Sequence, residues 1–388
     1  MRRVRWLIIA IPIVIILTIA GIWGMQQSKQ QAEQVTVPTK VEGAASKVKP
    51  AKKKEVVKKT PRPGWLTQRQ AIKQIDQLVN QHHIMGTLLF TTNGPKNVRV
   101  RTYGYADASD QVRNTATEAY PLASLQKALT GAVIQHLINE GKLSMTTPLS
   151  RFYPDIPYAN QITIRELLNH TSGMRMVEHT PNSVLPTEQA QIAFTIKHAL
   201  STGNHAYAYT NANFTLLAGV IRKVTHKSYM TALQNVIIKP LGLKHTYAYN
   251  DIPGNVVNPA SYRLSNGESQ GAIISKPLQS SELGCGSLYM SVGDYYKFMY
   301  SLQSGDLLSD AGIAELSDHF QTKYAAGIYY QKGGTIRVGG NDNAFHTYYM
   351  GTRDARVGVV LFENQGDFSN DNKVANSIQS ILMKTENF

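Results

Sequence analysis

The order of strand-like and helix-like segments in residues 65–388 limits the folds open to this chain. Residues 85–94 and 97–107 have the pattern of a hairpin, with Asn93-Gly94 near its turn. Further strand-like segments come late, at residues 325–333, 334–340, 344–352 and 356–364, and the region from about 140 to 280 between them is mostly helical and loop-rich. This order predicts an α+β fold, in which helices flank one antiparallel sheet built from both chain ends and a mostly helical insertion packs against it.

Three helices stand out within this region. Residues 67–83 form an amphipathic pattern with Thr67 as its N-cap, and His82-His83 stands at its end. A second helix begins near Ser124, and apolar residues recur along it at helical spacing. A third helix is expected at residues 372–384, close to the end of the chain.

The N-terminal part of the chain differs sharply in charge from the rest. Residues 1–64 carry 13 Lys and Arg against 3 Asp and Glu, whereas the remaining 324 residues are close to neutral, with 27 against 23. Nucleic-acid binding needs a concentrated basic face, so the body of the protein is not expected to bind nucleic acid.

Residues 1–25 are interpreted as a cytoplasmic stub and a transmembrane anchor. Residues 6–23 contain no charge and are bracketed by two tryptophans, and a run of this length can span a bilayer. The arginines before it would keep the N-terminus cytoplasmic and the catalytic domain extracellular, as a single-pass protein of the cell membrane. A cleaved signal peptide is the alternative. Residues 26–64 are Lys-rich and without aromatics, as in a disordered extracellular stalk, which either tethers the domain or also attracts anionic wall polymers.

A serine and a lysine three residues apart begin the second helix. Ser124 and Lys127 form an S-x-x-K pair, and residues at this spacing share a helix face. A lysine can activate a serine hydroxyl only if its pKa is lowered, and an apolar helix start near the positive end of the dipole favours such a shift. The pattern alone also fits a surface lysine beside an N-terminal serine.

A second short motif precedes an apolar helix further along. Tyr209-Thr210-Asn211 is a Y-x-N, in which a tyrosine hydroxyl can relay a proton and an asparagine amide can hold a lysine and a substrate. Tyr207 competes with Tyr209, but only Tyr209 has an asparagine two residues later. A buried tyrosine with a helix-capping asparagine is the alternative.

Together with these motifs, longer segments resemble the serine β-lactamase and penicillin-binding protein superfamily. The segments are "NEGKLSMTTPLSRFYPDIP", "ITIRELLNHTSGM", "IIKPLGLKHTY" and "GCGSLYMSVGDYYKF", in the order of that family, and the resemblance covers residues 65–388. The resemblance is strongest to the class C β-lactamase and D-alanyl-D-alanine carboxypeptidase branch of the superfamily. It implies a β-lactamase/DD-peptidase-like fold, with Ser124 as the acylated nucleophile, Lys127 as the base, Tyr209 as the proton relay and Asn211 as a positioning residue.

The third motif of this family is a Lys-x-Gly or His-x-Gly on an inner strand. The resemblance aligns it with Arg337-Val338-Gly339 and assigns the second oxyanion donor, beside the Ser124 amide, to the N–H of Gly340. The two adjacent glycines also permit a register one residue away. Arginine here departs from the family pattern, because it can bind a carboxylate or a phosphodiester but is a poor proton donor.

Other candidate residues have simpler explanations. The family resemblance makes the loop at His170-Thr171-Ser172-Gly173 structural, and Cys285 between two glycines is expected to be a buried small residue. The histidines show no metal-binding spacing, so no metal site is expected, and no cofactor is expected either. No G-x-S-x-G motif occurs, so a nucleophile elbow is absent. His346, Tyr348 and Tyr349 either line the cleft or are ordinary strand residues.

The resemblance implies acyl transfer through an acyl-serine. The overall form is similar to teichoic-acid D-alanyl esterases of Gram-positive bacteria, with (lipo)teichoic acid as the cell-wall substrate. The alternatives are a D-alanyl-D-alanine carboxypeptidase acting on peptidoglycan stem peptides, a non-catalytic cell-wall sensor, and a β-lactamase, for which no deacylating base is evident.

Overall fold

The computed structural model describes residues 63–386, apart from residues 266–267, 273 and 319–321. The chain divides into two compact units, Met1–Lys59 and Thr60–Phe388, and the description below concerns the second unit only. The expected anchor at residues 1–25 and nearly all of the expected stalk at 26–64 lie outside the described residues. Every helix within the described ranges is too short or too polar to cross a membrane.

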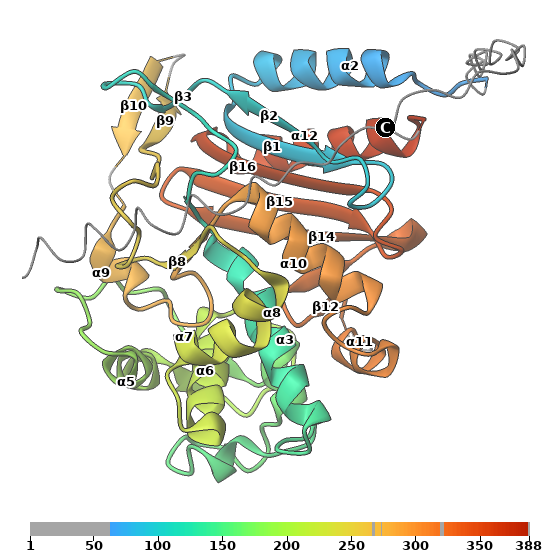
Figure 1. The fold of residues 1–388 in the computed structure, drawn as a ribbon. Coiled ribbons are helices and arrows are strands. Elements are labelled where there is room, and N and C mark those ends of the chain that lie inside the picture. The colour runs from blue at the N-terminus through green and yellow to red at the C-terminus, as the bar shows by residue number, and fades with distance from the viewer. Residues whose placement is uncertain (1–62, 266–267, 273, 319–321, 387–388) are drawn as a thin grey trace, which may run out of the picture. The chain divides into compact units, whose positions relative to one another are not determined.

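A nine-stranded sheet forms the centre of this unit (Figure 1). β16 is paired antiparallel to β15 on one side and to β1 on the other, which brings the two chain ends together as predicted. The order runs β10-β9-β16-β15-β14-β13-β12, and β2 pairs with β1. The strands are β1 (Met85–Thr91), β2 (Arg99–Tyr103), β9 (Ser261–Ser265), β10 (Glu268–Ala272), β12 (Tyr324–Ala325), β13 (Ile328–Tyr330), β14 (Thr335–Asp342), β15 (Phe345–Thr352) and β16 (Gly358–Gly366).

Short strands and helices complete the unit. The short strands are β3 (Tyr105–Asp107), β4 (Val112–Arg113), β5 (Tyr120–Pro121), β6 (Met174–Arg175), β7 (Leu200–Ser201), β8 (Thr246–Ala248) and β11 (Leu288–Met290). The helices are α2 (Gln68–Gln81), α3 (Gln126–Asn139), α4 (Ile164–Leu168), α5 (Glu188–His198), α6 (Asn211–Thr225), α7 (Tyr229–Leu233), α8 (Lys239–Leu241), α9 (Lys276–Gln279), α10 (Val292–Ser304), α11 (Asp310–Leu316) and α12 (Phe368–Met383).

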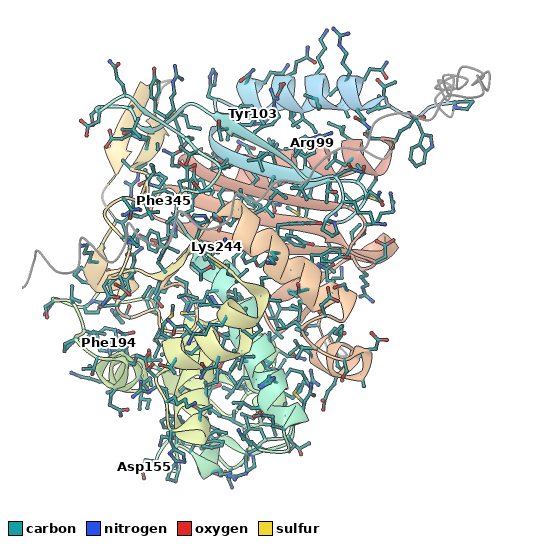
Figure 2. The ribbon with its side chains drawn as sticks, viewed as in Figure 1. Arg99, Tyr103, Asp155, Phe194, Lys244 and Phe345 are labelled. Carbon is teal, nitrogen blue, oxygen red and sulfur yellow. The ribbon has the colours of Figure 1, made fainter. Side chains whose placement is uncertain are left out.

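The two faces of the sheet are covered by different helices. α2 and α12 cover one face, where their apolar residues bury Tyr348, Met350 and Leu361. Tyr103 on the outer strand β2 lies beside α2, and its hydroxyl donates to Asp76 of that helix (Figure 2). α3, α6 and α10 belong to a larger core on the other face, which includes Val338 and Phe345.

Most elements agree with the sequence predictions. Thr67 caps α2 through a reciprocal bond with Gln70, because each side chain accepts from the other's backbone. The hairpin β1–β2 and the strands β12 to β16 fall where predicted. The hairpin β9–β10 within the region expected to be helical was not predicted. Its strand β9 pairs parallel to β16, so the sheet is mixed and not wholly antiparallel as predicted. α3 is buried around nearly its whole circumference, which explains why its apolar residues lie on more than one face.

Candidate active site

Ser124 lies in a tight turn between strand β5 and helix α3. The 3₁₀ turn Ala123–Leu125 leads directly into α3, and Ala123 before the serine has a φ of 47°, in the left-handed region that a residue with a Cβ rarely adopts. Leu125 and Ala123 are buried, whereas Ser124 remains partly exposed. The turn therefore fixes the serine hydroxyl at the surface of an otherwise buried segment.

Lys127 is fully buried one turn further along, and three oxygen atoms surround its Nζ. Its Nζ donates to Oγ of Ser124 at 2.9 Å, to Oδ1 of Asn211 at 2.8 Å and to the Cys285 carbonyl at 3.4 Å. Three acceptors around one nitrogen match an ammonium group, which donates three bonds and accepts none. The three oxygens are therefore placed where each can accept from the ammonium form of Lys127.

The expectation that the helix start keeps Lys127 neutral is wrong. Burial lowers its pKa, but the neighbouring Tyr209, Cys285 and Glu282 raise it by more, so the net pKa of Lys127 lies above the usual lysine value. Lys127 can therefore accept a proton from Ser124 only after the Lys127–Tyr209 pair has lost one.

Tyr209 is the tyrosine that reaches the serine. Its hydroxyl donates to Oγ of Ser124 at 2.7 Å, and Nζ of Lys127 lies 4.9 Å from the centre of its ring. The ring lies 4.4 Å from the ring of His170, which is fully buried. Burial lowers the pKa of His170 well below its usual value, so this histidine is neutral and supports Tyr209 by packing. Tyr207 is as exposed as Tyr209, but its hydroxyl contacts Tyr329.

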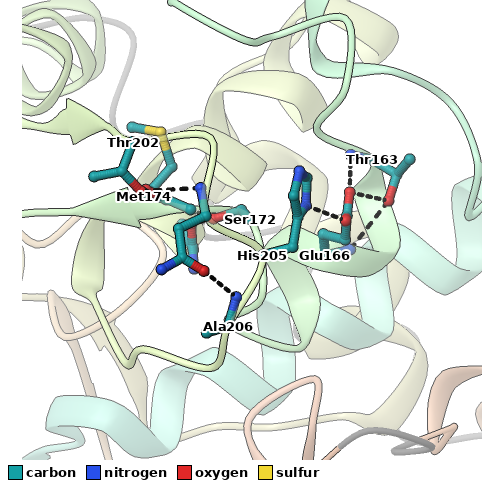
Figure 3. Close-up of polar contacts among 10 residues, drawn as sticks. Thr163, Glu166, Ser172, Met174, Thr202, His205 and Ala206 are labelled. Atoms are coloured by element: carbon teal, nitrogen blue, oxygen red, sulfur yellow. Dashed lines mark hydrogen bonds and ion pairs between the residues drawn. The ribbon is translucent and has the colours of Figure 1, made fainter.

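The loop before Tyr209 is held by polar contacts to α4 (Figure 3). Nδ1 of His205 lies 2.5 Å from Oε1 of Glu166, and the other oxygen of this carboxylate accepts from the backbone and hydroxyl of Thr163. Ala208 donates its N–H to the His170 carbonyl at 2.8 Å. These bonds attach both ends of the loop, so Tyr209 has a fixed approach to Ser124.

Asn211 begins helix α6 and contacts two charged groups. Its Oδ1 accepts from Lys127, and its Nδ2 donates to Oε1 of Glu178 at 2.5 Å. The expected positioning residue is thus next to Lys127, and Glu178 is a further member of the site that sequence patterns did not indicate. Glu178 lies in a loop with no motif around it, 33 residues before Asn211.

The arginine assigned to the third motif makes its contacts elsewhere. The Arg337 guanidinium lies 4.4 Å from the centre of the Tyr329 ring, and its Nη1 donates to Asn372 of α12 at 3.4 Å. Arg337 pairs with Met350, which lies in the core under α2 and α12. Within the described residues, these contacts place the Arg337 guanidinium with Tyr329 and Asn372 and not with the catalytic group.

Gly340 is the residue of β14 that approaches the serine turn. A Cβ on it would lie 2.7 Å from the Leu122 carbonyl and 3.1 Å from Cβ of Ala123, so only glycine fits there. Side chains alternate along a strand, and Val338 therefore faces the same side as Gly340. The motif that faces Ser124 is thus Val338-Gly339-Gly340, one residue later than the alignment with Arg337, and Gly339 faces the opposite side.

The backbone hydrogen bonds of β14 also change which residue is expected to supply the second oxyanion donor. Gln331 donates its N–H to the Thr335 carbonyl at 2.9 Å, so these two residues form a hydrogen-bonded pair between β13 and β14. Because hydrogen-bonded and non-hydrogen-bonded pairs alternate along antiparallel strands, the N–H of Arg337, two residues further along β14, points toward β13. The N–H of Gly340 then points toward β15, where this glycine pairs with Thr347, and the N–H of Asn341 lies on the strand edge beyond the end of β13. We therefore assign the second donor to Asn341 instead of Gly340.

The remaining candidates have structural roles. Cys285 is buried, as expected, and burial raises the pKa of its thiol to about 12, while its carbonyl accepts from Lys127. Tyr348 and Tyr349 are buried strand residues in the two opposite cores. Oγ of Ser172 donates to Asn213 and accepts from the N–H of Met174, which makes its loop structural.

The comparisons with known proteins agree with this geometry. The profile of the family described as Beta-lactamase matches residues 71–381. Penicillin-binding protein PbpX of Bacillus subtilis is 27% identical over 337 residues, which cover 85% of this chain and 84% of the relative. Teichoic acid D-alanine hydrolase of Staphylococcus aureus is 26% identical over 347 residues, covering 88% and 83%.

Two solved structures have the same fold. FmtA from Staphylococcus aureus superposes with a TM-score of 0.72 at 22% identity, over 84% of this chain and 90% of that one. D-amino acid amidase from Ochrobactrum anthropi gives a TM-score of 0.70 at 21% identity, over 81% and 97%. With the family profile and the grouping of Ser124, Lys127 and Tyr209, these matches assign the protein: it belongs to the beta-lactamase family and is a serine hydrolase related to penicillin-binding proteins.

Proposed function

We propose that this protein removes D-alanine esters from teichoic acid through an acyl-serine intermediate. The observation that carries the proposal is the apolar Val338 on the strand face that approaches Ser124. A cation at this position would hold a carboxylate next to the scissile bond, as a peptide ending in D-Ala-D-Ala presents it. Val338 offers no such charge and suits a substrate whose leaving group is an uncharged alcohol.

Acylation follows from the contacts of Ser124. Its Oγ attacks the ester carbonyl, and its proton passes to the Lys127–Tyr209 pair once that pair has lost a proton. The backbone N–H groups of Ser124 and Asn341 stabilise the oxyanion. The C–O bond to the alcohol then breaks, and the Tyr209 hydroxyl, bonded to Oγ at 2.7 Å, delivers the proton to the departing oxygen.

Deacylation reverses these roles. Water attacks the acyl-serine carbonyl, gives its proton to the same pair, and D-alanine leaves as Ser124 recovers its hydrogen. An alcohol leaves as an alkoxide more readily than an amine leaves as an amide anion, so an ester requires less of the proton donor than a peptide does. A site without a third-motif lysine or histidine therefore suits ester cleavage.

The names of similar proteins support this substrate class. One relative is named a teichoic acid D-alanine hydrolase, and a protein of the same fold is named a D-amino acid amidase. Both names describe the release of a D-amino acid. The uncharged run at residues 6–23 further supports placing the domain outside the membrane, where such polymers occur.

The test compares the hydrolysis of two substrates by the full-length protein and by its Ser124→Ala variant. Each is incubated with D-alanylated lipoteichoic acid or with a stem pentapeptide ending in D-Ala-D-Ala, and free D-alanine is measured. We expect release from the teichoic acid that is lost in Ser124→Ala. Release from the pentapeptide alone would replace the esterase with a carboxypeptidase. No release from either substrate by a folded protein would favour a non-catalytic sensor.

A further inference from the structure

Gln126 and Thr130 are fully buried polar residues of helix α3 that lie one turn apart on one helix face. Both contact the hydroxyl of Tyr229, a buried residue of α7. Oγ1 of Thr130 lies 2.6 Å from this hydroxyl, and Nε2 of Gln126 donates to it at 3.3 Å. Burial of a polar side chain is costly unless its hydrogen bonds are satisfied, so the remaining contacts of this group show what it holds in place.

The group holds the segment of residues 284–288. Oγ1 of Thr130 donates to the Gly284 carbonyl at 2.7 Å, and Oε1 of Gln126 accepts from the N–H of Leu288 at 2.9 Å. The Cys285 carbonyl, which accepts from Lys127, lies between these two attachment points along the chain. One helix therefore carries both the lysine and the side chains that fix the place of its acceptor.

The direction of each hydrogen bond in the group follows from its two ends. The Gly284 carbonyl can only accept, so Thr130 donates its one hydroxyl hydrogen there, and the hydrogen shared with Tyr229 comes from the tyrosine. The N–H of Leu288 can only donate, so it fixes Oε1 of Gln126 as the acceptor and directs Nε2 to Tyr229. One donor chain thus runs from Gln126 to Gly284, and in such a chain each bond strengthens the next.

Gly284 is also packed closely against helix α6. Its φ is 79°, and a Cβ there would lie 2.7 Å from the Phe214 carbonyl and 2.8 Å from Cβ of Ala218. With α6 packed against Gly284 and Thr130 bonded to its carbonyl, the segment has one position relative to α3.

The Cys285 carbonyl stabilises one protonation state of Lys127. A carbonyl oxygen accepts a hydrogen bond from an ammonium, and it therefore favours the ammonium over the neutral amine. Unlike Oγ of Ser124, this oxygen takes no part in bond making or breaking. Its distance from Nζ, 3.4 Å, is the longest of the three contacts of the lysine, so a small shift of the segment decides whether it acts.

Other elements also place titratable groups around this lysine. They are Tyr209, the Cys285 thiol, Glu282, His170 and, beyond Asn211, Glu178. Burial lowers the pKa of the lysine, and the first three of these groups raise it. His170 is neutral, because burial keeps its pKa well below the usual value. A substitution of Thr130 changes none of these groups and alters only the support of the carbonyl.

We propose that the donor chain ending at Thr130 positions the Cys285 carbonyl against Nζ of Lys127 and so tunes how readily this lysine takes the proton of the nucleophile. Thr130, Tyr229 and Gln126 are thus positioning residues, because they act through the carbonyl and touch no reacting atom. This inference rests on the acyl-serine chemistry of the proposed function and not on the identity of its substrate.

Thr130→Val is the main test, because it removes the hydroxyl and keeps the shape of the side chain. The kcat/KM of the full-length protein on 4-nitrobenzyl propionate is measured from about pH 6 to 11, with Ser124→Ala as the background. In Thr130→Val the ammonium loses the support of an acceptor, so the pH at which the rise in kcat/KM levels off should move down by about 0.5–1 unit. Thr130→Ser keeps the hydroxyl and should keep the wild-type profile.

Two further variants make the result specific. Tyr229→Phe breaks the same chain but keeps the bond from Thr130 to Gly284, so it should shift the profile in the same direction by less, and it decides the question if Thr130→Val does not fold. Thr195→Val removes a fully buried hydroxyl of α5 that has no partner among the described residues, and it should leave the profile unchanged.

The position of the profile, and not the height of its plateau, separates the two possible roles of Thr130. Folded Thr130→Val and Tyr229→Phe proteins whose profiles level off at the wild-type pH, whatever their rates, would overturn the positioning role and leave the esterase standing. Absence of Ser124-dependent ester hydrolysis by the wild type at every pH would overturn the esterase and the positioning role together.

Discussion

The hydroxyl of Tyr209 donates a hydrogen bond of 2.7 Å to Oγ of Ser124, whereas Tyr207, two residues earlier and equally exposed, turns to Tyr329. The two tyrosines thus form a natural comparison. They share a loop, a residue type and an exposed fraction, and they differ in whether they reach the nucleophile.

Replacement of Tyr209 by phenylalanine is expected to remove the proton relay and little else. Since 41% of the side chain is exposed, the fold should not change, and kcat on D-alanyl ester should fall by about 10²- to 10⁴-fold. Tyr207→Phe should stay within about 3-fold of wild type. Equal losses in the two variants, measured by steady-state kinetics, would show that the loop matters and not the hydroxyl.

The pH dependence follows from the raised pKa of Lys127. The reactive form of the Lys127–Tyr209 pair has one proton fewer than the resting form, so kcat/KM should rise with pH between 7 and 10, at about tenfold per unit until the pair titrates. 4-Nitrobenzyl propionate is the suitable substrate because it has no titrating group. Ser124→Ala measures the background hydrolysis. A rate that is already constant below pH 7 would mean that Lys127 is neutral in the resting site.

Gly340 should tolerate no side chain. Alanine there would bring a Cβ within 2.5 Å of Oγ1 of Thr347 and 2.7 Å of the Leu122 carbonyl, which displaces the serine turn. We expect Gly340→Ala to lose about 1–3 kcal/mol of unfolding free energy and most of its activity. Gly254→Ala, which meets nothing within 4 Å, is the matched control. Urea denaturation and ester hydrolysis measure the two effects, and a fully active Gly340→Ala would refute this account of the turn.

Variants of Arg337 and Val338 distinguish the two possible alignments of the third motif with β14. Arg337→Ala should change kcat/KM on D-alanyl ester by less than about 3-fold, because its contacts lie with Tyr329 and Asn372. Val338→Lys, if its melting temperature shows that this buried substitution is tolerated, should increase binding of substrates that end in a carboxylate. Competition by acetyl-D-alanine measures this binding. A large loss in Arg337→Ala with no effect in Val338→Lys would restore the alignment with Arg337.

The sequence was sufficient for the parts of the site that depend on local spacing. Ser124 and Lys127 lie one turn apart, and Tyr209 and Asn211 flank a helix start, so short motifs identified them. The register of β14 was harder to predict, because it depends on which face of the strand packs against the Ser124 turn. The adjacent glycines gave no local signal for either register. Glu178 and Glu282 reach the site from loops without a motif, and only the fold brings them near Lys127.

The buried carboxylate of Glu363 on strand β16 supplies the last prediction. Burial, with the neighbouring Asp371, raises the pKa of Glu363 well above its usual value, and burial raises the pKa of Asp371 to about 6. The charge of Asp367 opposes the ionisation of Asp371, and Nδ1 of His82 lies 3.8 Å from Oδ1 of Asp371. The folded state therefore binds more protons than the unfolded state above the usual carboxyl range.

The sign of the effect on stability follows directly. A carboxyl group whose pKa is raised by folding stabilises the fold at low pH and loses this contribution as the pH rises, so the melting temperature should fall between pH 4.5 and 8. Glu363→Gln should flatten this decline and melt higher than wild type at pH 8, since a neutral amide replaces an unpaired buried charge. Glu140→Gln, which removes an exposed carboxylate at the end of α3, should keep the wild-type slope. If calorimetry gave parallel curves for wild type and Glu363→Gln, the ionisation of Glu363 would not be coupled to folding.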